Sequence, residues 1–319
     1  MLLKILFSLS LLHAGFITAK LEDHFKQAIN KTDLHKMENI DFIYMINLDA
    51  RPEKFQYCLS QLLPYGIHPY RFSAVNGWEL SLEEINDVAL SYEPGMKGTM
   101  FGTSFLPENH GKPSHELIRV YGKKYFGHYV SQGMIGCTLS HLSVLQDAYD
   151  SKYPTIWVME DDIEVIQDPR KVSHLIQELD DLVGKDNWDV LFTDYSTKDR
   201  NGHRVFCQSY APRPNFTPNN PKRFAEYLPI PPFIKIGARY GTYSMIVRRS
   251  GIEKILTFIK EHQIFLAYDM ELSLPNDIQM FVVQEDVVST CPQAPSDNVA
   301  PNYLKTTSQK QPDSIDFNK

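Results

Sequence analysis

Residues 156–162 read Ile-Trp-Val-Met-Glu-Asp-Asp, so a run of four apolar residues passes directly into three carboxylates. An apolar run without polar alternation is typical of a strand buried on both faces, as in the middle of a parallel sheet. In open α/β sheets, ligands bind beyond the carboxyl ends of the strands. The stretch therefore predicts a central strand with a ligand site at Glu160, Asp161 and Asp162.

A strand–helix–strand pattern precedes this stretch. Residues 42–46 form another continuous apolar run, and apolar residues recur at helical spacing over residues 53–63. A second strand is predicted over residues 70–75, ending at an Asn-Gly pair. This is a βαβ signature, which predicts an α/β fold with a doubly wound, mostly parallel sheet flanked by helices in a single catalytic domain.

Similar patterns continue the fold through helices from residue 136, over 172–182 and over 251–260, and through strands over 188–192, 242–247 and 281–283. Two stretches interrupt the pattern. Residues 91–135, rich in glycine, lysine and histidine, are expected to form a long loop that is functional or disordered. Residues 196–237 are rich in proline, which argues against a central strand or helix and predicts a surface loop.

The composition limits the class of protein. Of 319 residues, 43% are hydrophobic and 22% are charged, as is usual for a folded globular chain. The net charge of −7 argues against a nucleic-acid binder, which would carry a basic stripe. The four cysteines form no CxxC pair, so a zinc cage is not expected.

The two ends of the chain have a sequence character different from that of the predicted domain. Residues 1–19 have the pattern of a signal peptide or an uncleaved signal anchor, so export or the secretory pathway is expected, with membrane attachment only if the segment is kept. Residues 20–39 are read as a linker or short helix and residues 40–294 as the catalytic domain. From residue 295 to 319 the chain is polar, and a disordered tail is expected.

The three carboxylates suit a metal ion. Adjacent acids repel one another and, when partly buried, hold raised pKa values unless a cation is present. Oxygen ligands fit a hard ion such as Mg²⁺ or Mn²⁺ that also binds substrate phosphates. A solvated acidic turn would give the same tripeptide, so Glu160, Asp161 and Asp162 are a hypothesis that depends on their place after the strand.

Further candidates follow the first strand, at Asn47 and Arg51. Asn47 could bind the base or ribose of a nucleoside, and the planar fork of Arg51 could bind a phosphate. Asp49 is instead expected to cap the helix that starts near Pro52.

Two later segments also carry polar side chains near the expected ligand edge. Small residues from Gly136 onward, at a predicted helix start, would leave backbone N–H groups for an anion. Ser140 and His141 lie off the apolar helix face, although adjacent residues cannot form a hydrolase triad. Asp269, between apolar residues, is a candidate general base, and helix capping is an equally open reading.

Taken in order, these segments resemble glycosyltransferase family 25, the group of bacterial lipopolysaccharide and lipooligosaccharide galactosyltransferase-like proteins and procollagen galactosyltransferases. The resemblance runs from about Ile43 to Ser289. Two positions depart from the family pattern, since Ala50 stands where Arg or Lys is frequent and Lys54 replaces a common Arg. The segments that carry the resemblance are 46–53, 73–77, 135–141, 158–162, 188–191, 241–244 and 268–269.

The resemblance implies a GT-A-like fold and inverting transfer of a sugar, often galactose, from a UDP-sugar to a glycan, lipid-linked or protein-linked acceptor, as in lipopolysaccharide biosynthesis. Asp161 and Asp162, with Glu160, would hold Mn²⁺ or Mg²⁺ against the diphosphate, and Asp269 would be the base. The donor pocket would be lined by Asn47, Arg51, Asn76, Ser140 and His141.

Two other functions share some of these features. A metal-dependent phosphoryl-transfer enzyme or hydrolase also uses clustered acids, but it predicts a phosphate-binding glycine loop or a second acidic cluster. The sequence has no GxxxxGK[ST] motif, and only Asp189 and Asp194 could build such a cluster. A catalytically inactive sugar-binding relative is the other alternative, and the intact acids at residues 160–162 argue against it.

Overall fold

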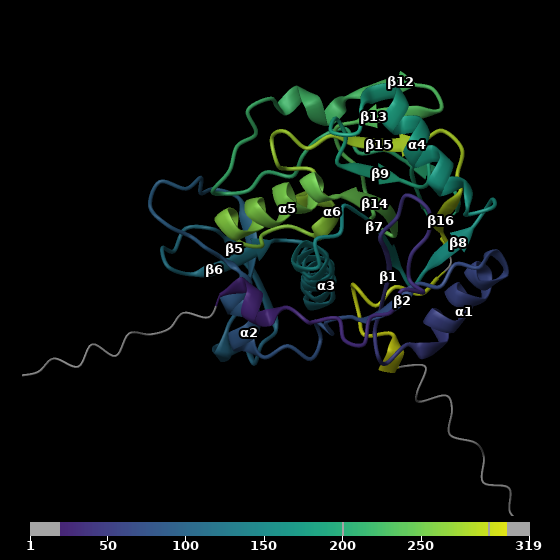
Figure 1. Ribbon diagram of the computed structural model, residues 1–319. Helices are drawn as coiled ribbons and strands as arrows, with labels where there is room; N and C mark the ends of the chain where they lie inside the picture. The colour runs from purple at the N-terminus through teal and green to yellow at the C-terminus, as the bar shows by residue number, and fades with distance from the viewer. Residues whose placement is uncertain (1–19, 200, 293, 305–319) are drawn as a thin grey trace, which may run out of the picture.

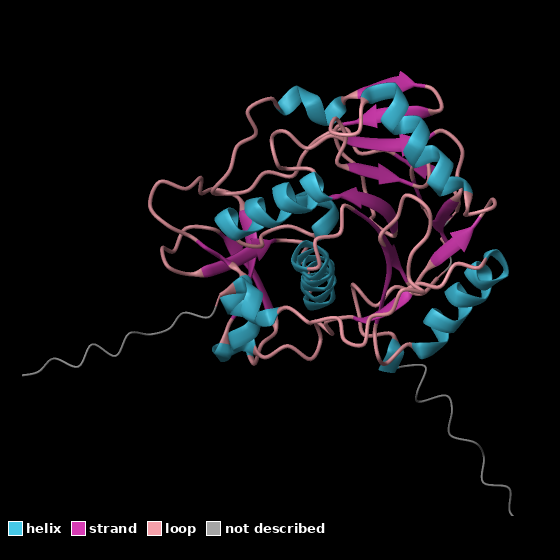
Figure 2. Cartoon of the chain, viewed as in Figure 1, coloured by secondary structure: helices cyan, strands magenta, loops and turns pink. Residues whose placement is uncertain are grey.

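The computed structural model describes residues 20–199, 201–292 and 294–304 (Figure 1). The predicted signal segment, residues 1–19, and residues 305–319 lie outside these ranges. Helices lie against a large sheet, as Figure 2 shows. Among the described residues, no helix has both the length and the apolar character that a membrane span needs.

The main sheet has eight strands. In spatial order they are β12 (Tyr227–Ile230), β13 (Phe233–Ile236), β15 (Met280–Val283), β9 (Val190–Phe192), β14 (Ser244–Arg248), β7 (Thr155–Glu160), β1 (Phe42–Asn47) and β2 (Tyr70–Ser73). Only β14 and β13 run against the other six, as the pairings of neighbours show. The predicted mostly parallel α/β sheet is therefore confirmed, with two reversed strands that the sequence did not indicate.

Helices cover both faces of this sheet. On one face lie α1 (Pro52–Leu62) and α4 (Lys171–Val183), and on the other lie α3 (Gln132–Asp150) and α5 (Arg249–His262). Successive side chains of a strand point to opposite faces. Ile43 and Met45 of β1 accordingly join one core, whereas Tyr44 and Ile46 join the other. This two-sided burial explains why the strand is apolar at every position.

Residues 91–135 are not the expected long loop. After α2 (Leu82–Val88), they contribute to an antiparallel four-stranded sheet in the order β3 (Leu90–Ser91), β6 (Lys124–Gly127), β4 (Phe101–Phe105) and β5 (Pro113–Leu117). Phe105, Ile118 and Phe126 from this region are buried in the core beneath α3. The strands are short and separated by glycine turns, so their apolar residues give no clear period, and the prediction was wrong.

The proline-rich stretch is also more regular than predicted. It contains the hairpin of β10 (Thr197–Lys198) and β11 (Arg204–Val205), and then β12 and β13 of the main sheet. Pro229 lies in β12, at the sheet edge, where a missing N–H group removes no central hydrogen bond. The segment 233–236 has no proline, so β13 can take a second-from-edge position that the prediction excluded.

Short elements complete the chain. They are α6 (Tyr268–Leu272), the antiparallel pair β8 (Ile163–Val165) and β16 (Val288–Thr290), and the 3₁₀ helices η1 (Leu21–His24), η2 (Leu63–Tyr65), η3 (Pro107–Asn109) and η4 (Pro221–Ala225). The expected linker thus includes η1. Its Lys31 forms an ion pair of 2.9 Å with Asp147 in α3, so this segment packs on the domain.

The C-terminal segment 294–304 also packs on the domain. The indole N–H of Trp78 donates to the backbone oxygen of Asp297 (2.7 Å), and Asn76 Nδ2 donates to Tyr303 Oη (3.0 Å). Asp297 and Tyr303 are each only 8% exposed. The predicted disordered tail is therefore wrong for residues 295–304. These contacts are with the loop after β2, far away in sequence, and local composition does not reveal them.

Candidate functional site

The carboxyl ends of β1, β2 and β7 surround a cavity, called the first cavity below. Ile46 of β1 pairs with Glu160 of β7, so the acids that follow β7 lie beside the end of β1. The cavity, counted together with the solvent space at its mouth, has a volume of about 630 Å³. Its lining residues include Lys54, Asn76, Ser140, Glu160, Asp161 and Asp162. The sequence-based prediction of a site at this edge is consistent with that geometry.

A second cavity, of about 900 Å³, lies toward α6. Thr242 and Asp269 line it. Glu160 and Asp162 line both cavities, together with Cys137 and Asn298. The carboxylates therefore form a wall that the two cavities share.

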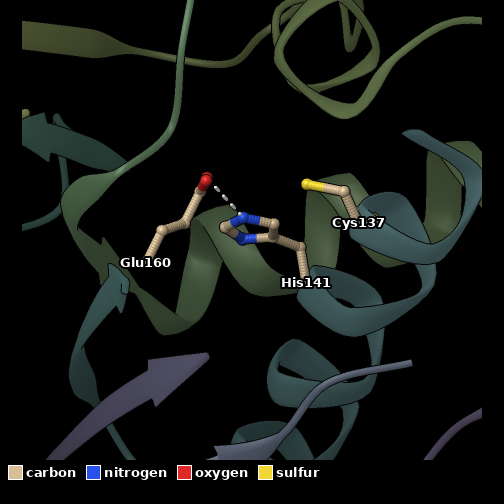
Figure 3. Close-up of side chains that lie close together, drawn as sticks. All are labelled: Cys137, His141 and Glu160. Atoms are coloured by element: carbon tan, nitrogen blue, oxygen red, sulfur yellow. Dashed lines mark hydrogen bonds and ion pairs between the residues drawn. The ribbon is translucent and has the colours of Figure 1, made fainter. Parts of the chain in front are cut away.

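Glu160 is held by two hydrogen bonds to the same oxygen. His141 Nε2 lies 3.0 Å from Glu160 Oε1, and Thr242 Oγ1 donates to it at 2.8 Å (Figure 3). Burial would raise the pKa of Glu160, but the hydrogen bond and the charge of His141, with Thr242, hold that pKa below its usual value. Glu160 is thus an ionised acceptor, which requires His141 to carry its proton on Nε2.

Asp161 is braced from the end of β1. Asn47 Nδ2 donates to Asp161 Oδ2 at 2.6 Å, and Lys54 Nζ lies 3.5 Å from Asp161 Oδ1. Burial nevertheless raises the pKa of Asp161, against the opposing effects of Lys54 and Asn47. Asn47 also donates to the backbone oxygen of Arg51 and accepts from Arg71. Its polar atoms are therefore engaged in positioning the acid, and it is buried behind the cavity rather than lining it.

Asp162 has the most unfavourable electrostatic environment of the three acids. Its Oδ1 atom is buried and has no hydrogen-bond partner in the described part of the chain. Burial, followed by the charges of Glu160 and Asp161, raises the pKa of Asp162 to about 7. A buried carboxylate oxygen without a donor is a group that a divalent cation would satisfy. The donor set at Asp161 and Asp162 consequently fits Mn²⁺ or Mg²⁺.

A second possible set of metal ligands lies next to Asp161 and Asp162. Ligand atoms of Cys137, His141 and Glu160 lie within 4.8 Å of one another, and Figure 3 shows Cys137 one turn before His141 on α3. Glu160 Oε1 is already bonded to His141 and Thr242, and burial raises the pKa of the Cys137 thiol well above its usual value. A cysteine sulfur is a soft ligand, which does not suit Mg²⁺ or Mn²⁺. The buried, unpaired oxygen of Asp162, next to Asp161, is therefore the feature that suits a hard ion.

The segment 136–141 has a different role from the predicted anion site. Helix α3 starts at Gln132, so Gly136 lies in its second turn and its N–H group is not at a helix start. A Cβ atom on Gly136 would lie 2.4 Å from the backbone nitrogen of Gly77, so glycine allows the loop after β2 to approach the helix. Ser140 Oγ accepts from Val75 N (2.8 Å) and fixes the same contact.

Ser140 and His141 are both buried, contrary to the expectation that they lie off the packed face. The His141 ring stacks on Tyr268 of α6, with 4.2 Å between ring centroids. His141 thereby connects α3, β7 and α6. It positions Glu160 through a hydrogen bond, and its ring also forms part of the wall of the first cavity.

Asp269 lies in α6 with both carboxylate oxygens bonded to backbone N–H groups. Gly241 N donates to Oδ2 at 3.0 Å, and Met270 N donates to Oδ1 at 2.9 Å. Burial raises the pKa of Asp269, with these two hydrogen bonds opposing it. Asp269 and Glu160 line the same cavity, so the structure brings the predicted base and the predicted metal site together.

Arg51 and Asp49 differ from their predicted roles. Arg51 itself is the N-cap residue of α1, and Asp49 accepts from Arg71 Nη2 (3.0 Å) and Ser73 Oγ (2.7 Å), so Asp49 is not the cap. Arg51 Nε lies 2.9 Å from Glu53 Oε1 and 3.6 Å from Asp297 Oδ2. It is buried among carboxylates, and it does not line either cavity.

Sequence reasoning missed two charged groups of the first cavity. Lys54 Nζ lies 3.5 Å from Asp161 Oδ1 and 3.8 Å from Asp297 Oδ2. The position of Lys54, in the first helical turn after a strand that ends at the ligand edge, was a usable signal. Asp297 gave none, because its placement depends on the C-terminal segment folding back over the site.

Comparison with known proteins gives a consistent result. A family model described as "Glycosyltransferase family 25 (LPS biosynthesis protein)" matches residues 40–272. A "Glycosyltransferase 25 family member" of Aedes aegypti is 26% identical over 172 residues, which are 54% of this chain and 24% of the relative. The human "Inactive glycosyltransferase 25 family member 3" is 22% identical over 217 residues, 68% of this chain and 28% of the relative. The chain thus spans about a quarter of the length of these relatives.

Proposed function

The chain belongs to glycosyltransferase family 25, and we propose that it transfers a hexosyl group, with galactose the expected sugar, from a UDP-sugar to a hydroxyl of a glycan or glycoconjugate, with inversion. The observation that carries the proposal is the shared wall, because Glu160 and Asp162 line both cavities. Transfer between two substrates needs such a junction, where donor and acceptor meet without water between them.

The first cavity suits the sugar nucleotide. Lys54 lines it and offers a cation to a diphosphate, and Asn76 offers an amide to the nucleoside. Asp161 and Asp162 would hold Mn²⁺ or Mg²⁺ there. When bound, the ion would neutralise the diphosphate and stabilise the UDP leaving group. The chain's own contribution is to orient these acids, through Asn47 for Asp161 and through His141 and Thr242 for neighbouring Glu160.

The second cavity suits the acceptor. Asp269 would take the proton from the attacking hydroxyl, because its oxygens are fixed by Gly241 and Met270 and it lines this cavity. Burial raises its pKa toward the operating range of a general base. Inversion would require the acceptor hydroxyl to attack the sugar from the side opposite the leaving diphosphate, and separate cavities for donor and acceptor support such an arrangement.

A non-catalytic sugar-nucleotide binder is the second candidate, because the human relative is named inactive. Purified protein would be incubated with UDP-sugars, Mn²⁺ and a panel of saccharide, lipid-linked and peptide acceptors, and products would be detected by mass spectrometry. UDP binding would be measured in parallel. Product formation supports the transferase, whereas UDP binding without product from any pair, or with donor hydrolysis alone, contradicts it.

We also propose that the N-terminal segment directs export, based on the apolar pattern of residues 1–19. Sequencing the N-terminus of the protein from its native host tests this. A mature chain that begins near residue 20, or one that is retained in the membrane fraction, supports export. A soluble cytosolic chain that keeps residues 1–19 contradicts it.

A further inference from the structure

A third cavity, of about 790 Å³, lies next to the proposed acceptor cavity. Ser196 lines the third cavity and Thr197, its chain neighbour, lines the acceptor cavity. Arg239 lines the third cavity and Tyr243 lines the acceptor cavity. Arg239 Nη2 donates a hydrogen bond to Tyr243 Oη at 2.7 Å. The two cavities are therefore neighbours, separated by these residues.

Three aromatic rings form one wall of this cavity. Tyr195, Phe206 and Tyr227 lie with ring centroids 5.8 to 6.2 Å apart and with near-perpendicular planes. The Arg204 guanidinium covers Tyr195, 4.2 Å from its centroid. Phe206 and Tyr227 are 46% and 43% exposed and lie in contact with one another, so they form a small exposed aromatic patch. Their open surfaces are available to a ligand.

The polar groups of the cavity are suited to hydroxyls. Ser196 is 4% exposed, and its Oγ atom has no hydrogen-bond partner among the described residues. Glu226 and Gln208 line the same space. Arg239 is the only cation among the described lining residues, and Asp194 Oδ1, 2.5 Å from Arg239 Nη2, neutralises it. Arg204, beside the cavity over Tyr195, has its Nη1 atom 3.7 Å from Asp286 Oδ1, so both cations already face a carboxylate and neither is free for a phosphate or carboxylate ligand.

We propose that this cavity binds a neutral sugar ring of the acceptor, one or two units away from the hydroxyl that is modified. The apolar C–H face of a hexose would stack on Phe206 and Tyr227, and its hydroxyls would bond to Ser196 and Glu226. An acyl chain would leave the buried Ser196 hydroxyl unsatisfied. The inference rests on the proposed function and names the class of acceptor, a saccharide of at least two units.

The test uses neutral saccharides as probes: lactose and the methyl glycosides of galactose, glucose, mannose and N-acetylglucosamine. Binding to the full chain would be followed by saturation-transfer NMR and titration, with UDP and Mn²⁺ present. We expect at least one probe to bind, and Phe206→Ala and Tyr227→Ala each to weaken it by about three- to tenfold. Leu228→Ala is the matched control, because Leu228 follows Tyr227 in β12, is exposed and does not line the cavity.

The outcomes separate the two proposals. The inference is overturned if no probe binds, if both aromatic variants bind the probes as the parent does, or if decanoate but no saccharide competes for the cavity. UDP affinity is measured in every variant and should stay unchanged, since neither aromatic residue lines the donor cavity. Failure of the parent to bind UDP would instead contradict the proposed function, whatever the saccharides do.

Discussion

Replacing Glu271 by Gln should destabilise the fold strongly, because Glu271 neutralises a buried arginine. Glu271 Oε2 lies 2.6 Å from Arg213 Nη1, and both side chains are almost fully buried. Glu271 Oε1 also accepts from Phe265 N (2.9 Å) and Leu266 N (2.8 Å), at the start of the chain segment that carries Asp269. Gln keeps the size of the side chain but removes the charge and places a donor against the guanidinium.

Removing one partner of a buried ion pair leaves an uncompensated charge and costs about 3–5 kcal/mol. Urea unfolding should therefore show a free energy of unfolding lower by that amount, and thermal unfolding a midpoint lower by roughly 10 °C. Asp33→Asn is the matched control, because Asp33 pairs with Lys36 on the surface. Its expected cost is below about 1 kcal/mol.

The double variant Arg213→Met/Glu271→Gln should recover part of the lost stability, because it removes both charges and keeps an amide oxygen that can accept from Phe265 N and Leu266 N. The reasoning would be refuted if Glu271→Gln unfolds within about 1 kcal/mol of the parent. It would also be refuted if the double variant is less stable than Glu271→Gln, because unpaired charge would then not be the cause.

Three further predictions concern the site. Gly136→Ala should lower the free energy of unfolding by about 1–3 kcal/mol and weaken UDP binding, since its Cβ would lie 2.4 Å from Gly77 N; unchanged urea midpoint and UDP affinity would contradict this. Lys54→Met should raise KM for the UDP-sugar by about tenfold, as expected for a lost charge-assisted contact, and Lys54→Arg should retain activity; equal KM values in steady-state assays would count against it. Because Asp269 must be ionised to act as base and burial raises its pKa, kcat/KM should fall as the pH decreases, with a midpoint above the ordinary aspartate pKa of 3.8; a pH profile that stays flat down to pH 4 would exclude that role.

The parts of the fold that the sequence predicted are those with a strong, local signal. β1 and β7 are apolar at every position because both faces are buried, and α4 and α5 have clear helical periods. The short strands of residues 91–135 and the edge strands β12 and β13 have no such period. They are stabilised by pairing with distant strands, which a local pattern cannot show.

The candidate site likewise contains residues that a local pattern reveals and residues that depend on distant contacts. Its three acids could be located because they follow a buried strand directly. The role of Asp49 was misread because Arg51, not Asp49, is the N-cap of α1, and the role of Gly136 was misread because α3 already starts at Gln132. Asp297 could not be found at all, because it reaches Lys54 only after more than two hundred residues have folded between them.

The central claim is that Asp162 binds the metal ion on which sugar transfer depends. Mn²⁺ binding in the presence of UDP would be measured by isothermal titration for the parent, for Asp162→Asn, and for Asp168→Asn, a surface acid paired with Arg170. The account predicts that Asp162→Asn lowers Mn²⁺ affinity and turnover each by at least about tenfold, while Asp168→Asn changes neither. Asp162→Asn that binds Mn²⁺ and turns over donor as the parent does would contradict it.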